Sequence, residues 1–329
     1  MKFTTTFFAI CAAATLALVG CSSSPDADNA GADGGITDSL RITTDGTMGA
    51  AAIHLGVEQG FFEDVGLTLE ITDSPNPPAA IAALQSNEVD IAAVPTVPSL
   101  NAQAQGIELI SIAPAQGYPE DSDAWADFDT SGVYANPDSN INSPKDLEGK
   151  TVAVNARKAV FEAYIQDAVK NDGGDPDQIN WVALDFGSQI EALRTGEIDV
   201  AGFGMPFNLE AEANGAEMVW APGASFFEGG VNSTWLASGE SIENTDAIDR
   251  FREALLKSNE YANENLDEAI EMGAELRDID VDLIEDSGRF IYFPTELPAE
   301  DIEVVSQKLV NLGFLEDTVD MTDRVVFEN

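Results

Sequence analysis

A short motif occurs twice in this chain, and its two copies limit the fold more than any other feature. The copies are Ala83–Val94 (ALQSNEVDIAAV) and Ala192–Phe203 (ALRTGEIDVAGF), which share Ala, Leu, Glu, Asp and Ala at matching positions. Each has the pattern of a helix end, a polar turn and a short apolar strand. They lie too far apart to be units of a solenoid, whose repeats recur every ~20–50 residues. Similar joints occur throughout α/β proteins, but the pair favours two related α/β lobes with a cleft between them.

The N-terminal segment has the pattern of a secreted and anchored protein. Residues 1–20 read as a signal peptide, because the apolar run Phe7–Val19 is shorter than the ~20 residues that span a bilayer. Its end, Leu18-Val19-Gly20-Cys21, resembles the bacterial lipobox, which implies cleavage before Cys21 and lipidation of that cysteine. The alternative is an ordinary signal peptide with an incidental cysteine. Residues 21–37 are rich in Ser, Asp, Ala, Asn and Gly, so we expect a flexible acidic tether.

Composition excludes several classes of function. The formal net charge of −44 argues against nucleic acid or an anionic lipid surface as the main partner. It does not reveal the charge of a ligand, because halotolerant secreted proteins also have acidic surfaces. Only Cys21 remains after signal removal, so no disulfide, thiolate–metal site or cysteine nucleophile is expected, and we predict no metal and no cofactor. The single histidine, His54, lies in an apolar helical run and is interpreted as a packed or half-exposed helix residue, with a catalytic base as the alternative.

The order of apolar runs predicts an α/β fold with a doubly wound, mostly parallel sheet in each of two lobes. We expect the first lobe over residues 38–115, the second over 116–222, and a return to the first lobe over 223–329. The tail has helical stripes that would pack on the first lobe. The chain would therefore cross between lobes near Pro114–Pro119 and Pro222–Asn232, and two crossings form a hinge. Strands are expected at 40–44, 67–71, 90–94, 109–113, 151–155, 179–184, 198–203 and 217–221.

An ordered series of segments adds a family resemblance. It includes Glu58–Ile71 (EQGFFEDVGLTLEI), the two repeat copies, Ser143–Val154 (SPKDLEGKTVAV) and Ile190–Phe207 (IEALRTGEIDVAGFGMPF). Over residues 38–329 the chain resembles the periplasmic substrate-binding proteins of the sulfonate, nitrate, taurine and thiamine-precursor type. The resemblance implies the two-lobed type II binding-protein fold and ligand capture for an ABC permease and its ATPase, not catalysis. With the lipobox, it implies a monomer anchored to the outer face of the cell membrane.

One branch with a similar fold consists of enzymes. The yeast-type pyrimidine synthases rely on a Cys-rich metal motif and a reactive histidine, and this sequence contains neither. A cell-surface hydrolase would have to rest on His54 beside a serine, so we expect no enzyme. A lipoprotein that docks on a receptor, as a ligand sensor, stays open as an alternative.

Candidate ligand-binding residues lie in loops after the predicted strands, because ligands of open α/β sheets sit beyond the strands' carboxyl ends. The strongest candidate loop is Asn155-Ala156-Arg157-Lys158. It contains two of the chain's few basic residues, and it precedes a predicted helix whose free N–H groups and dipole favour an anion. Arg157 could hold a sulfonate or carboxylate through two hydrogen bonds. Its alternative is a solvated charge that balances nearby acids. The candidates are Thr44, Asp45, Thr47, Asn76, Thr96, Asn155, Arg157, Phe161, Phe207 and Trp235.

These residues favour a small organic anion of the sulfonate or carboxylate type. A neutral heterocycle like the thiamine precursors is the alternative ligand, although the first loop, Thr44–Gly49, has no aromatic residue to stack on it. The alternative role of the candidate threonines is to stabilise turns through hydrogen bonds of their hydroxyls. The alternative role of the candidate aromatic residues is to pack in the core.

Overall fold

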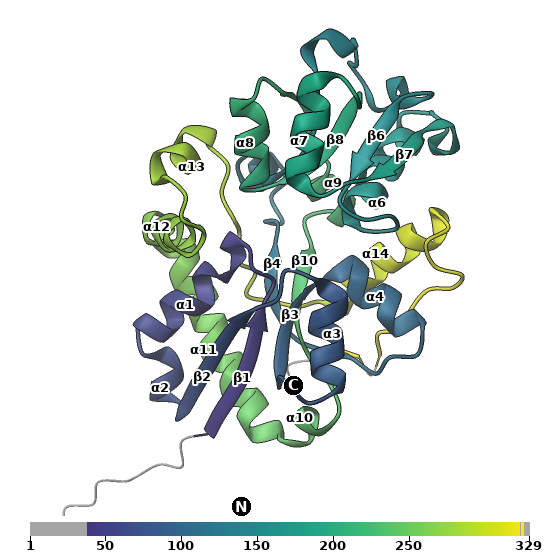
Figure 1. The fold of residues 1–329 in the computed structure, drawn as a ribbon. Coiled ribbons are helices and arrows are strands. Elements are labelled where there is room, and N and C mark those ends of the chain that lie inside the picture. Colours follow the sequence, from purple (N-terminus) through teal and green to yellow (C-terminus); the bar gives the residue numbers. More distant parts are fainter. Residues whose placement is uncertain (1–37, 323, 326–329) are drawn as a thin grey trace, which may run out of the picture. The chain divides into compact units, whose positions relative to one another are not determined.

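Two five-stranded sheets organise the part of the chain that the computed structural model describes, which is residues 38–322, 324 and 325 (Figure 1). Cys21, the signal segment and the tether lie outside the described residues. The first sheet has the order β2 (Leu67–Asp73), β1 (Asp38–Thr44), β3 (Ile91–Pro95), β10 (Val231–Ala237), β4 (Ile110–Gly117). The second has the order β7 (Asn180–Ala183), β6 (Thr151–Val154), β8 (Val200–Gly204), β5 (Ser131–Ala135), β9 (Glu217–Trp220).

The two sheets have the same internal arrangement. In each, three parallel strands are followed by one antiparallel strand, which is β10 in the first sheet and β5 in the second. The last strand pairs antiparallel to that reversed strand and so runs with the other three. The fold is thus α/β with mostly parallel sheets, as predicted.

The sequence analysis missed both reversed strands, β5 and β10. Neither has the period-2 alternation of a half-buried strand, because each is central and buried on both faces. Their composition also made them hard to recognise as strands, because β5 contains Gly132 and β10 contains the buried polar residues Ser233 and Thr234.

Helices cover the faces of both sheets. Those that accompany the first sheet before the crossing are α1 (Ala51–Glu58), α2 (Phe61–Asp64), α3 (Pro77–Gln85) and α4 (Thr96–Ala104). Those of the central segment are α5 (Trp125–Phe128), α6 (Val160–Asn171), α7 (Phe186–Thr195), α8 (Phe207–Ala213) and α9 (Gly223–Phe227). The C-terminal segment adds α10 (Glu240–Glu243), α11 (Thr245–Glu264), α12 (Leu266–Arg277), α13 (Val281–Ser287) and α14 (Ala299–Asn311).

The repeated motif has the same structural role in both copies. Asp90 accepts a hydrogen bond from the backbone N–H of Arg41 on the neighbouring parallel strand (2.8 Å), and Asp199 accepts one from Thr151 in the same way (2.8 Å). The turn before each strand contains a left-handed residue, Asn87 in one copy and Gly196 in the other. The aspartate therefore fixes the start of the central strand pair in each lobe, which explains why it recurs.

The C-terminal helices pack in two different places. The 20-residue helix α11 lies against α1, and an added Cβ at Gly56 would come within 1.8 Å of the Ser258 hydroxyl oxygen. This close approach and the ring of Phe251 against Trp235 bury the first sheet's core. Helix α14 instead contacts α4 and α9, so it lies where the first lobe meets the segment that returns from the second.

Two neighbouring strands carry the chain between the lobes. β4 leads out of the first sheet and β10 leads back into it, and the two pair antiparallel at the centre of the molecule (Figure 1). The backbone N–H of Tyr118 donates to the carbonyl oxygen of Gly230 (3.2 Å) just beyond this pair. The described residues nevertheless form one compact unit.

The shared role of the repeated aspartates is testable. Asp90→Ala and Asp199→Ala should each lower the free energy of unfolding by about 1 kcal/mol, because a partly buried backbone N–H loses its charged acceptor. The matched controls are Glu88→Ala and Glu197→Ala, the repeated glutamates two residues earlier, which should stay within about 0.5 kcal/mol of the parent. Urea unfolding followed by circular dichroism measures all four. Equal losses from the aspartate and glutamate variants would contradict this role.

Candidate functional site

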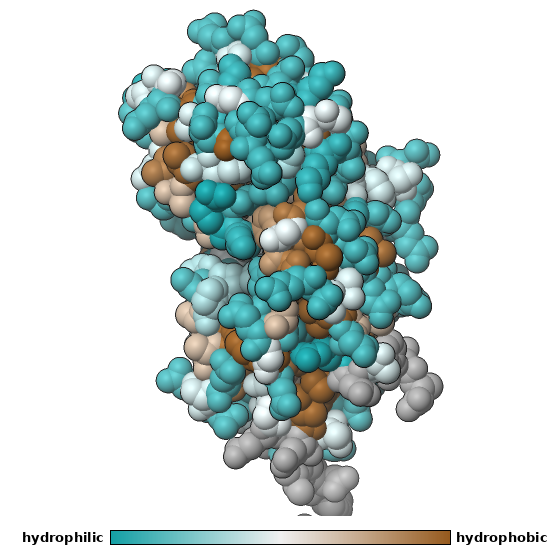
Figure 2. All heavy atoms as spheres, turned by 90° about the vertical axis from the view of Figure 1, so that its right-hand side faces the viewer, coloured by the Kyte–Doolittle hydropathy of each residue, from teal (hydrophilic) through white to brown (hydrophobic). Residues whose placement is uncertain are grey.

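A cavity of about 660 Å³ lies between the two lobes and receives residues from both. Its lining follows the carboxyl ends of β1 and β3 in the first lobe and of β6 and β8 in the second, which is where open α/β sheets bind ligands. In Figure 2 hydrophobic residues gather at the middle of the displayed face, whereas hydrophilic residues cover most of the remainder. The cavity is large enough for a small organic molecule.

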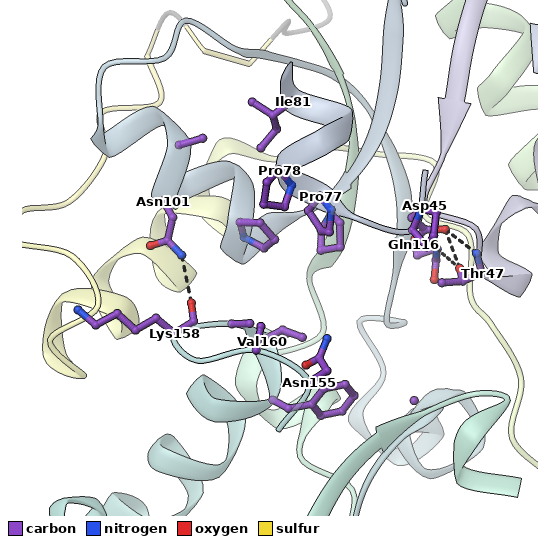
Figure 3. A pocket seen from close by; sticks show the side chains of 18 of the residues that line it. Asp45, Thr47, Pro77, Pro78, Ile81, Asn101, Gln116, Asn155, Lys158 and Val160 are labelled. Carbon is purple, nitrogen blue, oxygen red and sulfur yellow. Dashed lines mark hydrogen bonds between the residues drawn. The ribbon is translucent and has the colours of Figure 1, made fainter. Parts of the chain in front are cut away.

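Most of the lining is apolar. Helices α3 and α4 of the first lobe and the residues just before them contribute a group of prolines and Ile81 (Figure 3). The second lobe contributes three phenylalanines, and the rings of Phe186 and Phe207 stack with their centroids 4.5 Å apart. Phe161 reaches the cavity by lying directly over Gly202, whose missing side chain leaves room for the ring. This part of the lining therefore offers an apolar surface to a ligand. The prolines are Pro75, Pro77, Pro78, Pro95 and Pro98.

One end of the cavity carries a carboxylate in a fixed set of hydrogen bonds (Figure 3). Asp45 Oδ1 accepts from the backbone N–H (3.0 Å) and the hydroxyl (2.7 Å) of Thr47, and Oδ2 accepts from the side-chain amide of Gln116 (3.0 Å). Gln116 reaches Asp45 because Gly49 has no side chain, since a Cβ there would lie 1.7 Å from the Gln116 amide nitrogen. The chain thus holds Asp45 at the cavity from two elements of the first lobe.

The environment of Asp45 disfavours the ionised form of its carboxyl. Burial raises the pKa of its carboxyl, although the hydrogen bonds from Thr47 and Gln116 and the charge of Arg277 act in the opposite direction. Arg277 itself is paired with Asp73 (2.9 Å). Asp320 provides an internal comparison, because it accepts the same two bonds from Thr322 at the same distances, 3.0 and 2.7 Å, on the exposed surface. There these bonds lower the pKa of the carboxyl, so the opposite shift at Asp45 comes from its position in the cavity.

The other end of the cavity holds Lys158 (Figure 3), and the preceding residue, Arg157, also lines the cavity. Arg157 is half exposed and makes two hydrogen bonds to the buried carboxylate of Glu162, Nε–Oε2 at 2.8 Å and Nη2–Oε1 at 2.9 Å. This partner raises the pKa of the guanidinium. The backbone carbonyl of Lys158 accepts a hydrogen bond across the cavity from the Asn101 amide of α4 (3.4 Å). Arg157 therefore neutralises Glu162, and the exposed Lys158 is left as the net positive charge of this end.

The N-terminus of α6 opens onto the same end. Its N-cap residue Ala159 offers no side-chain hydrogen bond, and Ala159, Val160 and Phe161 all line the cavity. The first N–H groups of a helix have no partner within the helix. Glu162 reaches back to accept from the Lys158 N–H, which places one negative charge in this first turn.

Six of the predicted ligand-binding residues line the cavity and four do not. Those that line it are Asp45, Thr47, Asn155, Arg157, Phe161 and Phe207.

The other four have structural partners instead. Thr44 donates to Asp73 (2.5 Å), Asn76 caps α3 by accepting from the Ala79 N–H (3.1 Å), and the buried Thr96 donates to the carbonyl of Val231 (3.0 Å). Trp235 is buried in the first core. Helix α4 begins at Thr96 directly after Pro95, and Pro98 lies in its first turn, where a proline fits.

Sequence reasoning missed several lining residues. Gln116 lies at the end of the crossing strand β4, and Thr130 and Ile291 come from irregular segments. The one available signal was the position of Gln116 beside the predicted crossing at Pro114–Pro119, since residues at a hinge face both lobes.

The described residues give little evidence of a histidine-based catalytic site, a metal site or a membrane-spanning helix. His54 is half buried on α1 and does not line the cavity, and burial lowers the pKa of its imidazole. Within the described ranges, no group of three or more His, Cys, Asp or Glu side chains could hold a metal ion. In the same part of the chain, no helix is both long and apolar enough to cross a bilayer.

A two-lobed α/β molecule with a cavity between its sheets has the periplasmic binding-protein fold, and solved structures with that fold match it. The alkanesulfonate-binding protein of Xanthomonas axonopodis pv. citri, solved bound to MOPS, superposes with a TM-score of 0.70 at 15% identity over 88% of this chain and 98% of that one. The aliphatic sulphonate binding protein of Escherichia coli gives a TM-score of 0.71 at 17% identity over 87% and 97%.

Sequence comparison gives the family. Residues 48–269 match the NMT1/THI5-like family, and the chain belongs to it. A Bacillus subtilis (strain 168) protein, whose name assigns it by inference to aliphatic sulfonate binding, is 23% identical over 269 residues, which is 80% of this chain and 77% of that protein.

The buried charge at Asp45 predicts an unusual pH dependence. Because the folded-state pKa of this carboxyl is raised above the unfolded value of about 3.9, ionisation costs folding free energy as the pH rises through that window. Asp45→Asn should therefore increase the free energy of unfolding at pH 7, and the gain should vanish below about pH 3.9, where the carboxyl is protonated in both states. Urea unfolding between pH 3 and 7 measures it.

The control is Asp320→Asn, which removes a carboxylate with the same hydrogen bonds from the exposed surface. It should give no gain at any pH, because the pKa of Asp320 is lowered and its ionised form favours the folded state. A gain at pH 7 that is equal in both variants would contradict the role of burial.

Proposed function

We propose that this protein is the solute-binding component of an ABC importer, which captures a small ligand between its lobes and delivers it to a permease and its ATPase. The observation that carries the proposal is the cavity, which is lined from both lobes and bridged by two paired strands. The family and the named relatives support it.

Capture would proceed by closure of the lobes about the strands β4 and β10. A ligand favours the closed state only if it makes contacts there that it lacks in the open state. The loops after β1 and β6 face one another across the cavity, so a ligand held by both would make such contacts (Figure 3).

The ligand proposed for this site is a small organic anion of the sulfonate or carboxylate type. Its anionic group would lie at the N-terminus of α6, where backbone N–H groups, Asn155 and the ammonium of Lys158 attract negative charge. Arg157 supports this site indirectly, because it neutralises the buried Glu162 that would otherwise repel an anion. The stacked Phe186 and Phe207 favour a flat heterocycle as the alternative ligand.

The rest of the chain fits an anchored receptor of this kind. We propose a signal peptide over residues 1–20, lipidation of Cys21 and a tether over 21–37, which would hold a monomer at the outer face of the cell membrane. The lobes would span 38–115 and 116–222, and residues 223–329 would return to the first lobe.

Removal of Arg157 tests the anion site. Arg157→Ala should weaken binding of a sulfonate or carboxylate by about ten- to a hundredfold, because it leaves the buried charge of Glu162 unpaired beside the site. A thermal-shift screen of alkyl and aryl sulfonates, carboxylates, nitrate and aminopyrimidines identifies the ligand, and isothermal titration calorimetry gives the affinities.

Arg194→Ala is the matched control. Arg194 is equally exposed and makes the same two-bond contact with a glutamate, Glu191, but it lies outside the cavity. Its removal should leave the affinity unchanged. Binding confined to aminopyrimidines would keep the importer and replace the ligand class, whereas equal effects of the two variants would remove Arg157 from the site.

A further inference from the structure

The C-terminal part of the chain contains a short stretch, residues 289–294, that is bonded to both lobes. It follows α13 and precedes α14, and we call it the strap. We propose that the strap limits how far the two lobes open, with Arg289 as its anchor on the second lobe and Asn263 as its anchor on the first. The inference rests on the lobe movement of the proposed function. It adds a third connection to the two strands that carry the chain between the lobes.

The first residues of the strap are anchored in the second lobe. Arg289 is only 9% exposed, and its guanidinium donates to Glu212 Oε1 of α8 (2.6 Å) and to the hydroxyl of the buried Tyr134 of β5 (2.9 Å). The Tyr134 hydroxyl donates in turn to the same Glu212 oxygen (2.8 Å). The backbone N–H of Phe290 donates to the carbonyl oxygen of Asp127 (2.7 Å). Because the bond to Glu212 joins two charged groups, this end is held more strongly than by neutral hydrogen bonds alone.

The last residues of the strap are anchored in the first lobe. Asn263 of α11 binds both backbone groups of Phe293, since its Oδ1 accepts from the N–H (3.1 Å) and its amide donates to the carbonyl oxygen (2.7 Å). One turn earlier on α11, the amide of the buried Asn259 donates to the carbonyl oxygen of Pro294 (2.7 Å). The side chain of Phe293 is buried in an apolar cluster with residues of α1, α11 and α12. This end therefore belongs to the first lobe.

Between its two ends, the strap passes the connection between the lobes at Gly117 of β4. The Gly117 N–H donates to the carbonyl oxygen of Tyr292 (3.1 Å). A Cβ at Gly117 would lie 2.7 Å from Cγ of Pro294 and 2.8 Å from the carbonyl oxygen of Gly230, which precedes β10. The outgoing connection, the returning connection and the strap thus meet at one residue without a side chain. The neighbouring strap residue Ile291 lines the cavity.

A chain segment that is anchored at both ends limits the separation of the parts that it joins. Four peptide units separate Arg289 from Phe293. An extended chain spans at most ~3.3–3.6 Å per residue, so these two Cα atoms can move apart to about 14 Å and no further while both anchors hold. A movement that brings the anchors together meets no such limit. In Figure 1 α13 lies beside α8, on the side of the molecule opposite α14, so the strap restrains opening on the α8 side.

Release of either anchor tests the strap in the ligand-free full chain. Arg289→Met removes the bonds of the second-lobe anchor, and Asn263→Ala removes those of the first-lobe anchor. Spin labels on cysteines at the exposed positions Ala79 of α3 and Ser188 of α7 report the distance between the lobes, with both native cysteines changed to serine. Each variant should shift the distance distribution to a longer mean and a greater width. Because the two anchors act in series, the double variant should shift it no further than the larger single shift.

The controls separate lobe movement from loss of structure. Arg194→Ala breaks an exposed ion pair within the second lobe and should leave the distance between the lobes unchanged. Labels at Ser188 and at Asn171 of α6, which both lie in the second lobe, should give the same distance in every variant. Glu212→Gln removes the charge of the second-lobe contact and keeps its shape, so it should shift the interlobe distance in the same direction and replaces Arg289→Met if that variant fails to fold.

Two results would overturn the inference. One is an interlobe distribution in the anchor variants that is identical to that of the parent chain, and the other is a pair of shifts that add in the double variant. Ligand binding is measured separately, so the strap and the proposed function can fail independently. A ligand that binds while the anchor variants leave the interlobe distance unchanged keeps the proposed function and rejects the strap. Longer distances in the anchor variants support the strap even if the ligand screen finds nothing.

Discussion

The pairing of β4 with β10 is the constraint on which the rest of the structure depends. These adjacent strands carry the chain out of the first lobe and back, so the two lobes are joined along one narrow line at the centre of the molecule. Because β10 returns antiparallel to β4, it is the one reversed strand among the five described strands of the first sheet. The carboxyl ends of both sheets then face one cavity. Gln116 lies at the end of β4, which links this connection directly to the ligand site.

The acidic groups at the two ends of the cavity have different partners. At one end a buried glutamate is neutralised by Arg157, as expected for an ion that must leave water. At the other end Asp45 makes no ion pair among the described residues, and burial raises the pKa of its carboxyl although its neutral donors act in the opposite direction. Proteins accept the cost of such burial mainly at functional sites, where a ligand can recover it.

The sequence predicted the architecture well because the architecture rests on local patterns. The repeated Leu, Glu and Asp mark equivalent joints, and Asp90 and Asp199 indeed bind equivalent neighbouring strands. Both central reversed strands were missed, since strands buried on both faces lose the alternation that identifies a strand.

The site was harder to predict than the fold. Residue type and position after a strand placed six candidates in the cavity, but they could not distinguish a side chain that caps a helix, such as Asn76, from one that faces a ligand. The pairing of Arg157 with Glu162 and the room that Gly49 leaves for Gln116 depend on three-dimensional packing.

The claim that the two lobes close on a ligand is tested most directly by a distance across the cavity. Cysteines are introduced at two exposed positions, Ala79 of α3 and Ser188 of α7, in a chain with Cys11 and Cys21 changed to serine. Spin labels on these cysteines report the distance between the two lobes by pulsed electron paramagnetic resonance. A saturating sulfonate ligand should shift the distance distribution to a shorter, narrower peak. A distribution that is identical with and without a bound ligand would contradict the account.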